Sequence, residues 1–538
     1  MEVIKYMNKI KFLLLILVCI YVVLFINIKV LGISSNDFEE DNLYFKSDEI
    51  IVILTQSESL LFKEYDLNYF GDINCIKIDD LTSSYKIKYL ENDTNVCFEN
   101  FRRILKLTVQ ESETTNIQSI LEEIKKREEV FCADLNYLIP IQKQHFNPSI
   151  TPEDMIDGID WALESIQLDE CYEILPDNCT EVNVGVFDSG IYIDNQDQGY
   201  YEYHEEFEGI DVILRNYVNQ GYTMSDNNDK EGHGTFVSSI IAAKRHNGKG
   251  INGVYNNLNL YMYKITDSSM FDLNNFVYTG ILISAINDAV NDNVNILNIS
   301  YGFEFDSMSQ PDNNKLNQIW QAFGNFPGLI VCASGNYGFD IDEEENYLYP
   351  ANYEFTNIIT VGALAENNNK WNNSNYGKNN VDIFAPGEEI YAATIPSSSN
   401  SSLYMFDSGT SYATAYVTGV AAILLSINTN LTPCMIKQIL LTTVQNNENL
   451  EDYCVSGGSL NAYNAVTYLL SINEEINEHN LQHIYHLVEY YNDNYHVYRC
   501  ICNNTFYEEH DWVLLSPYAI IPGSIRQVCS VCGVEKFE

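Results

Sequence analysis

The residue best suited to covalent chemistry is Ser411, in the segment SGTSYATAYVTGVAAILL at residues 408–425. The run after the serine is small, apolar and punctuated by glycine, which predicts a helix that begins at Ser411 and is buried along its length. A serine in the first turn of such a helix lies beside backbone N–H groups and the positive end of the helix dipole, and both would stabilise an oxyanion. Ser411 is therefore a candidate nucleophile.

A serine hydroxyl is a weak nucleophile until a base removes its proton, so this chemistry also needs a histidine and an acid. Asp188 lies in VNVGVFDSGI at residues 182–191, an apolar, β-branched run that predicts a buried strand with the carboxylate at its carboxyl end. His233 lies in GHGT, immediately before an apolar helix start. Each residue alone is ordinary, as a turn former, a loop histidine or a helix cap. Together they provide an acid, a base and a nucleophile.

The segments DSG, GHGT and GTSYA, in the order Asp, His, Ser, resemble the motifs of the subtilisin-like serine proteases. LIVCASGNYG at residues 329–338 is similar to the family's strand and turn that carry the oxyanion-hole asparagine, which here is Asn336. The resemblance extends from about residue 161 to residue 470 and includes NILNISYG, YPANY, ITVGA and FAPG. Four motifs in order are far more specific than any one of them.

The resemblance implies a role for each matched residue. Asp188 would orient His233, His233 would take the proton of Ser411, and Asn336 would donate to the oxyanion together with the backbone N–H of Ser411. After the serine the family has Met-Ala-x-Pro-His, whereas this chain has YATAY at residues 412–416. This departure loses a proline and changes a side pocket, but it removes no reacting group. The alternative is a catalytically inert subtilisin-like scaffold that acts as a surface binding or adhesion protein.

Alternating strands and helices must position these residues, and their order predicts an α/β domain with a parallel sheet and helices on both faces. The reactive residues then collect at the carboxyl ends of the strands. Strands are predicted at residues 182–188, 258–265, 294–299, 328–333 and 358–363, and helices at 273–291 and 432–444 and from His233 and Ser411 onward. We expect this subtilisin-like domain to cover residues 158–471.

The resemblance also implies the substrate-binding walls. One segment would pair with the peptide as an added strand, and another would form the opposite wall of the pocket for the side chain before the cut bond. These residues are Ser300, Tyr301, Gly302, Ser334 and Gly335. Leu348 is expected near the base of the pocket, which would favour a modest apolar side chain.

Two residues resemble the family's calcium ligands. Glu206, in HEEFE at residues 204–208, matches the segment after the catalytic aspartate, and Asn247 falls in the matching loop. Carboxylate and amide oxygens suit calcium. In a chain this acidic, a solvated surface charge is the alternative for Glu206.

The chain has 538 residues, of which 46% are hydrophobic, and a formal net charge of −46. Its length predicts two or three domains. The negative charge disfavours nucleic acid as a partner, because phosphate would be repelled, and suits a soluble protein in a secreted, cation-rich setting. Polypeptide substrates are what the family resemblance implies.

Residues 1–32 begin with a segment that carries three lysines, Lys5, Lys9 and Lys11, and continue with the apolar run FLLLILVCIYVVLFI at 12–26, which predicts a signal peptide. A signal anchor is the alternative, since no clear cleavage motif follows. Both imply a secreted or surface-anchored protein that contacts the membrane only through this segment, if it is uncleaved.

Residues 36–141 contain predicted strands at 50–54, 104–109 and 130–141 and an amphipathic helix at 115–127. A small α+β domain in this place resembles the family's propeptide, which assists folding, inhibits the cleft intramolecularly and is then cut off. The protein would accordingly be made as a proenzyme. A merely structural domain is the alternative, and residues 142–157, with two prolines, are the expected exposed processing segment.

The end of the chain predicts a linker at residues 472–495 and a small cysteine-rich tail at 496–538. The tail resembles a zinc ribbon, and its four candidate ligands would leave no open position, so the zinc would be structural. The ligands would be Cys500, Cys502, Cys529 and Cys532. Disulfides are the alternative in an exported protein.

Overall fold

The computed structural model describes most of the chain from Tyr44 to Asn477 and several strands beyond it. The described ranges are 44–55, 70, 73, 75–81, 103–110, 116–140, 161–194, 202–218, 228–266, 276–304, 317–353, 355–396, 402–477, 485–490, 495–500, 505–509, 512–514, 526–529 and 535–537. The predicted signal segment at residues 1–32 and the predicted processing segment at 142–157 lie outside them. The chain divides into two compact units, Met1–Val466 and Thr467–Glu538.

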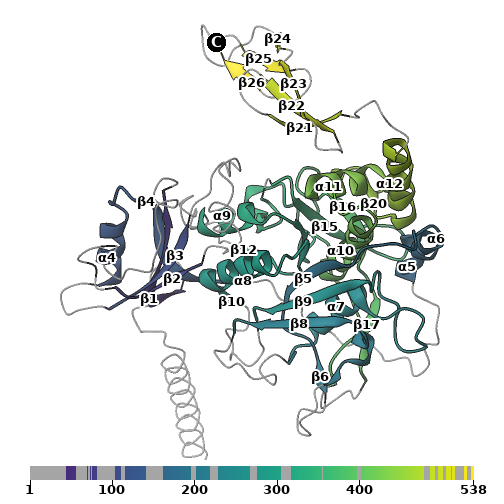
Figure 1. The fold of residues 1–538 in the computed structure, drawn as a ribbon, viewed down its shortest axis with the longest axis horizontal. Coiled ribbons are helices and arrows are strands. Elements are labelled where there is room, and N and C mark those ends of the chain that lie inside the picture. The colour runs from purple at the N-terminus through teal and green to yellow at the C-terminus, as the bar shows by residue number, and fades with distance from the viewer. Residues whose placement is uncertain are drawn as a thin grey trace, which may run out of the picture. The chain divides into compact units, whose positions relative to one another are not determined.

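A nine-stranded sheet forms the centre of the first unit (Figure 1). Its order is β19-β20-β16-β15-β13-β11-β5-β9-β8, and every neighbouring pair is parallel except β19 with β20. The strands are β5 (Val182–Asp188), β8 (Asp211–Asn216), β9 (Leu258–Lys264), β11 (Ile296–Ile299), β13 (Leu329–Ala333), β15 (Ile358–Leu364), β16 (Ile383–Pro386), β19 (Gln445–Asn446) and β20 (Gly458–Ser459). The predicted α/β class with a mostly parallel sheet is confirmed.

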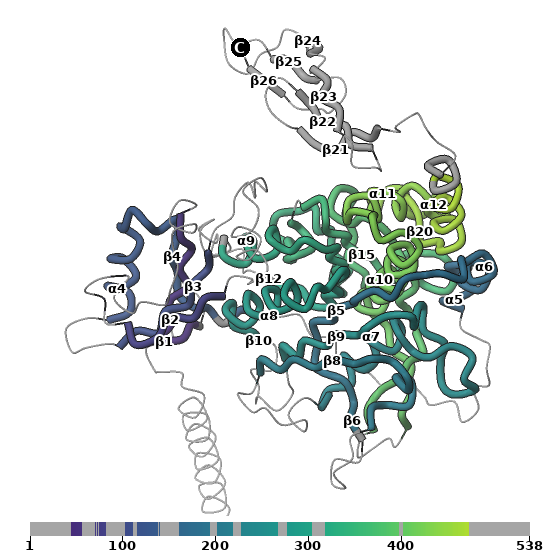
Figure 2. Tube along the Cα trace, in the orientation of Figure 1, coloured from purple at the N-terminus to yellow at the C-terminus, as the bar shows by residue number. Residues whose placement is uncertain are grey.

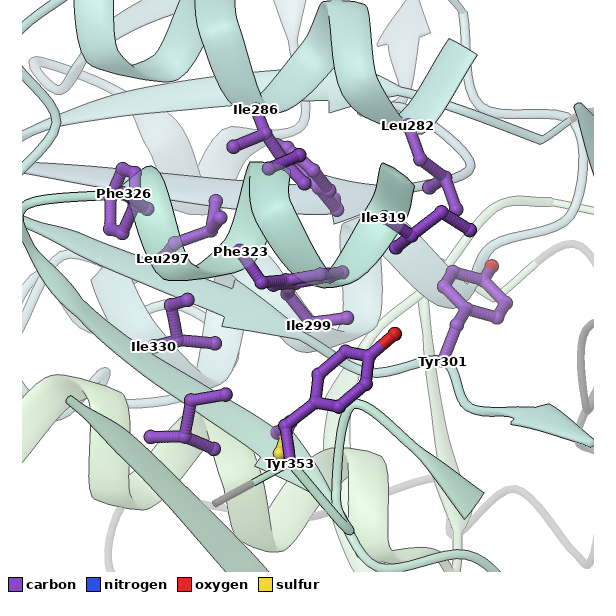
Figure 3. Close-up of a cluster of buried hydrophobic side chains, with 14 of the residues drawn as sticks. Leu282, Ile286, Leu297, Ile299, Tyr301, Ile319, Phe323, Phe326, Ile330 and Tyr353 are labelled. Carbon is purple, nitrogen blue, oxygen red and sulfur yellow. The ribbon is translucent and has the colours of Figure 1, made fainter. Parts of the chain in front are cut away.

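Helices cover both faces of this sheet, because its central strands are apolar on both sides. In β11, Leu297 and Ile299 join a buried cluster with helices α8 (Thr279–Asn291) and α9 (Asn317–Asn325) (Figure 3). Asn298 between them faces the other layer, since alternate residues of a strand point to opposite faces. There its Oδ1 accepts a 2.9 Å hydrogen bond from Thr418 of α10 (Thr410–Ile427).

Helix α10 packs beside α7 (His233–Ala242) and is apolar all round, as expected of a helix enclosed by other elements. It begins at Thr410, one residue before the predicted start, with Gly409 as its N-cap. Among the described residues it is the one helix long and apolar enough to cross a membrane, and 94% of that stretch is buried inside the protein.

The strand order changes direction beside β5. The chain passes from β5 to β8 and β9 on one side of it and then to β11, β13, β15 and β16 on the other. At such a switch point the carboxyl ends of adjacent strands border a crevice. Asp188 ends β5 and Ser300 directly follows β11, so the topology brings these two positions to one edge of the sheet.

Shorter elements complete this part of the chain, and Figure 2 traces the path between them. They are α5 (Trp161–Ser165), α6 (Leu168–Glu173), β6 (Ile193–Asp194), β7 (Glu202–Tyr203), β12 (Phe303–Glu304), β14 (Leu348–Tyr349), β17 (Ile390–Ala393), β18 (Tyr404–Asp407), α11 (Pro433–Thr442) and α12 (Ala462–Asn477).

The N-terminal residues form a second, smaller sheet of order β10-β4-β1-β3-β2. Four strands are N-terminal, β1 (Tyr44–Leu54), β2 (Cys75–Asp80), β3 (Ile104–Val109) and β4 (Val130–Pro140), and helix α4 (Ile117–Ile124) packs on them. The fifth strand, β10 (Phe276–Tyr278), precedes α8 and pairs antiparallel with β4. The helix predicted over residues 273–291 is therefore wrong at its start, because residues 276–278 extend this sheet instead.

Asn136 of β4 also fixes the start of α8, which has no side-chain cap of its own. Its Oδ1 accepts hydrogen bonds from Thr279 Oγ1 (3.0 Å) and from the backbone N–H of Gly280 (2.9 Å). Its Nδ2 donates to the buried carboxylate of Glu49. The N-terminal sheet therefore satisfies backbone and side-chain groups of the α/β domain.

The second unit contains two three-stranded sheets, β21-β22-β23 and β24-β25-β26. Their strands are β21 (Tyr485–Tyr490), β22 (Tyr495–Cys500), β23 (Thr505–Glu509), β24 (Trp512–Leu514), β25 (Arg526–Cys529) and β26 (Glu535–Phe537). The predicted linker at residues 472–495 differs from the structure, because α12 continues to residue 477 and β21 pairs with β22.

Candidate active site

Asp188 is fully buried at the end of β5, where the backbone turns away from the sheet. Its Oδ1 accepts a hydrogen bond from the backbone N–H of Ser189 (2.8 Å), and Ser189 Oγ lies 3.2 Å from the same oxygen. A buried carboxylate is stable only when its oxygens are bonded, and these contacts belong to the adjoining turn. Contacts within the adjoining turn therefore hold the Asp188 carboxylate in place.

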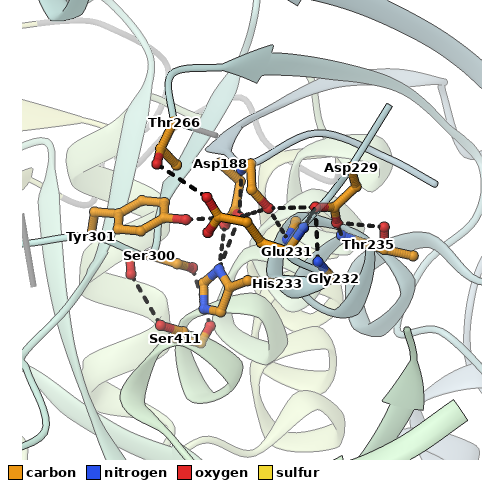
Figure 4. A network of polar contacts seen from close by, with 12 residues as sticks. Asp188, Asp229, Glu231, Gly232, His233, Thr235, Thr266, Ser300, Tyr301 and Ser411 are labelled. Atoms are coloured by element: carbon orange, nitrogen blue, oxygen red, sulfur yellow. Dashed lines mark hydrogen bonds and ion pairs between the residues drawn. The ribbon is translucent and has the colours of Figure 1, made fainter. Parts of the chain in front are cut away.

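His233 is the first residue of α7 and turns its ring towards Asp188 (Figure 4). Its Nδ1 lies 2.9 Å from Oδ1 and 3.0 Å from Oδ2 of Asp188. This contact assigns the Nδ1 proton to the side of the acid and leaves Nε2 as the proton acceptor of the neutral ring.

Asp229 holds the turn that carries His233, a role that the sequence analysis did not assign. Its buried carboxylate accepts from the backbone N–H groups of Glu231 (2.9 Å), Gly232 (2.9 Å) and Thr235 (3.0 Å) and from the Ser189 hydroxyl (2.9 Å). It therefore caps α7 and ties this helix to the loop of Asp188. The sequence signal for this capping role is the position of Asp229, a few residues before GHGT at a predicted helix start.

Ser411 lies in the first turn of α10 and is 2% exposed. Its Oγ donates to the carbonyl oxygen of Ser300 at 3.0 Å, and Ser300 Oγ lies 3.3 Å from the carbonyl oxygen of Ser411. Figure 4 shows the second ring nitrogen of His233 on the Ser411 side of the ring. The acid, the imidazole and the hydroxyl therefore lie in that order at this edge of the sheet.

Asn336 follows β13 and is anchored to the start of α10. Its Oδ1 accepts from the backbone N–H of Thr410 (2.9 Å) and from Thr410 Oγ1 (2.9 Å). Because the amide group is planar, its Nδ2 donor is directed away from Thr410. The backbone N–H of Ser411 has no helical partner four residues earlier, since it belongs to the first turn. Asn336 and the Ser411 N–H, the two predicted oxyanion donors, therefore both belong to the region where α10 begins.

The electrostatic surroundings of His233 are strongly negative. Burial acts to lower the pKa of His233, but the charge of Asp188, its hydrogen bond, and the charges of Asp407 and Glu231 outweigh burial and raise that pKa. Asp407 is itself buried and is bonded by the Tyr412 hydroxyl, and burial raises the pKa of Asp407. The imidazolium form that arises during proton transfer is accordingly well stabilised.

The residues predicted to form the substrate walls lie close to Ser411 and Asn336, and their binding role stays a prediction. Ser300 contacts Ser411, and Ser334 and Gly335 directly follow β13 beside Asn336. An added Cβ at Gly302 would lie 2.5 Å from the side chain of Leu348, so Leu348 packs directly against that glycine. Tyr301 differs from the other wall residues, because its hydroxyl bonds to Asp188.

The two predicted calcium ligands differ in which buried atom lacks a hydrogen-bond partner, an acceptor oxygen in one and a donor nitrogen in the other. Glu206 is fully buried, its Oε1 accepts from the Ile251 backbone N–H at 2.8 Å, and its Oε2 is buried without a hydrogen-bond partner. Such an oxygen fits a cation ligand. Asn247, however, has its Oδ1 bonded to the Lys249 backbone N–H (2.9 Å), and the atom left buried without a partner is its donor Nδ2. Within the described ranges no group of three or more His, Cys, Asp or Glu side chains is placed to hold a metal ion.

The described residues include two of the four predicted zinc ligands. Cys502 and Cys532 lie outside the described residues. Cys500 ends β22 in one sheet of the second unit and Cys529 ends β25 in the other. Zinc binding by the tail stays a prediction.

Comparison with known proteins points to one family. A family model described as the Subtilase family matches residues 180–462. The thermophilic serine proteinase of Bacillus sp. (strain AK1) is 28% identical over 355 residues, which is 66% of this chain and 77% of that protein. Subtilisin DY of Bacillus licheniformis is 32% identical over 222 residues, covering 41% of this chain and 73% of that protein.

Other relatives are much longer or more distant. Subtilisin-like protease 2 of Plasmodium falciparum (isolate 3D7) is 29% identical over 288 residues, and the match covers 53% of this chain but only 20% of that protein. A crystal structure of MycP1 from Mycobacterium smegmatis aligns at 21% identity with a TM-score of 0.46, covering 61% of this chain and 90% of that chain.

Proposed function

Since this chain belongs to the subtilase family of serine endopeptidases, we propose that it cleaves polypeptides with Ser411 as nucleophile, His233 as general base and Asp188 as the acid that orients the base. The observation that supports this assignment most directly is the bond from His233 Nδ1 to Asp188, which leaves Nε2 facing Ser411.

The proposed reaction begins with attack of Ser411 Oγ on the peptide carbonyl carbon. The Oγ proton passes to Nε2 of His233 as the bond to the Ser300 carbonyl is given up. Asn336 Nδ2 and the Ser411 N–H then donate to the oxyanion. Collapse of the tetrahedral intermediate expels the amine, which takes the proton from His233, and water hydrolyses the acyl-enzyme by the same route.

We further propose that the protein is made as an exported proenzyme whose N-terminal sheet inhibits the enzyme within the same chain. The last N-terminal strand supports this proposal, because Ile139 and Pro140 of β4 pair with Val277 and Phe276 of β10. The same strand caps α8 through Asn136. Calcium at Glu206 and structural zinc in the tail are proposed as cofactors on chemical grounds alone.

The test is expression of the full chain beside two variants, Ser411→Ala and the matched control Ser426→Ala in the same helix. Ser426 Oγ donates to the Ile423 carbonyl at 2.7 Å and also bonds to Tyr255, and neither contact involves the triad, so its loss should leave catalysis intact. We expect wild type and Ser426→Ala to react with a fluorophosphonate and to lose the residues before a cut at about 142–157, the predicted processing segment. Ser411→Ala should do neither.

Two results would contradict the proposal. Absence of labelling in both the wild type and the control would favour the inert scaffold. Processing of Ser411→Ala at the same rate as the wild type would show that another protease makes the cut.

A further inference from the structure

Tyr301 lies immediately after Ser300, yet its side chain turns away from the crevice into the protein. It is 2% exposed and belongs to the buried cluster beneath helices α8 and α9 (Figure 3). Its ring centroid lies 5.4 Å from that of His233, and its hydroxyl donates to Asp188 Oδ1 at 3.2 Å (Figure 4). One side chain thus touches both the acid and the base.

The donor set of Asp188 shows what this hydroxyl adds. Ser189 contributes its backbone N–H from the loop next to Asp188, and His233 contributes the proton of Nδ1. Tyr301 reaches the same oxygen from the segment that follows the adjacent strand β11, more than a hundred residues away in the sequence. It therefore holds the carboxylate against the sheet from a third direction.

We propose that Tyr301 is a positioning residue of the triad, whose hydroxyl fixes the Asp188 carboxylate and moderates its attraction for the proton of His233. This inference rests on the proposed function of Ser411, His233 and Asp188. A hydrogen bond to an anion stabilises the anion, so it weakens the pull of that anion on a neighbouring proton.

Weakening the pull of Asp188 on this proton matters because several negatively charged residues surround His233. The charged and titratable groups around it come from the end of β5, the turn before α7, the segment after β11, the end of β18, the start of α10 and strand β9. They are Asp188, Asp229, Glu231, Tyr301, Asp407, Tyr412 and Lys264. A general base whose pKa rises too far stays protonated at working pH and cannot accept the serine proton.

Tyr301 is suited to act as a permanent donor. Burial and the charge of Asp188 raise its pKa well above the ordinary value, so the hydroxyl keeps its proton across the range in which His233 titrates. Phenylalanine would keep the ring, its packing and its contact with His233, and would remove only the bond to Asp188.

The test is the pH dependence of Ser411 labelling by a fluorophosphonate in the full chain. Wild type is compared with Tyr301→Phe and with Tyr353→Phe, a matched control. Tyr353 is a buried tyrosine of the same cluster (Figure 3), and its ring packs against Phe323 and Tyr349. Both variants lose one buried hydroxyl, and only Tyr301 touches the triad.

For Tyr301→Phe we expect the acidic limb of the profile, where His233 is protonated, to move up by about 0.5 to 1 pH unit. Labelling on that limb should slow roughly 3- to 10-fold, with the difference fading as the pH rises. Tyr353→Phe should leave the limb in place. If the acidic limb of the pH profile does not move in Tyr301→Phe, or moves equally in both variants, Tyr301 only packs in the core and does not position the triad.

A second measurement decides the inference without catalysis. In a Ser411→Ala background, the His233 ring can be titrated by NMR with and without Tyr301→Phe. The expected result is a higher pKa for His233 in the Tyr301→Phe chain, and an unchanged or lower pKa refutes the proposal. If the wild type is not labelled at any pH, the proposed function fails, while this titration still judges the role of Tyr301.

Discussion

Gly234 is the residue on which the contact between His233 and Asp188 depends most sharply. It directly follows His233 in α7, and its backbone N–H donates to Ser189 Oγ at 2.9 Å. A Cβ built on Gly234 would lie 2.2 Å from the carbonyl oxygen of Gly190 and 3.1 Å from Asp188 Oδ1. The helix start therefore approaches the loop of the acid as closely as a glycine allows.

The effect of Gly234→Ala follows from these distances. Real Cβ atoms essentially never come within 3.0 Å of such a neighbour, so α7 and the loop would have to separate by about 0.8 Å. Nδ1 of His233 now lies 2.9 Å from Asp188 Oδ1, and that separation would lengthen it to about 3.7 Å, beyond a hydrogen bond. Misplacing a catalytic group by about 1 Å costs on the order of 10²-fold in rate, so we expect a loss of at least this size.

The assay is the rate of fluorophosphonate labelling of Ser411 at the pH optimum, with circular dichroism as a check of folding. Ser238→Ala is the control, because Ser238 lies in the same helix and its buried Oγ has no hydrogen-bond partner. That variant should label at the wild-type rate. A folded Gly234→Ala protein that labels within threefold of the wild type would refute the close-approach argument.

Three further predictions concern charge, capping and the candidate cation site. Asp407→Asn removes a negative neighbour of His233, so the acidic limb of the labelling profile should move to lower pH, opposite to Tyr301→Phe; a limb that stays in place would contradict this. Asn136→Ala, made in the full chain inactivated by Ser411→Ala, should lower the free energy of unfolding by about 1–2 kcal/mol in denaturant titration, because the start of α8 loses the side chain that caps it. A change below about 0.3 kcal/mol would be inconsistent with that role. Burial raises the pKa of Glu206 to about 7, so without metal the folded chain holds an extra proton and should lose stability as pH rises from about 4.5 to 7. Glu206→Gln should flatten that loss in thermal melts, and calcium should raise the melting temperature of the parent but not of this variant; equal calcium shifts would argue against a site at Glu206.

Local sequence was sufficient to identify the elements that carry the reactive groups. The apolar run before Asp188, the apolar runs after His233 and Ser411, and the strand before Asn336 all form strands or helices close to the predicted residues. Their periodicity and length reflect burial within a parallel sheet and its covering helices, which each segment encodes by itself. The alternation of strands and helices likewise determined the α/β class.

Contacts between distant segments were decided only by the tertiary structure. The bond from Tyr301 to Asp188 joins the segment after β11 to the end of β5, the Asp229 network joins a turn to the loop after β5, and β10 joins the N-terminal sheet. None of these residues has an unusual local pattern, and residues 276–278 were compatible with a helix until β4 supplied a pairing edge. A hydrogen bond or a close approach depends on where two chain segments meet in space. Sequence patterns therefore specified the triad's residue types, whereas packing determined the distances and charges that set their chemistry.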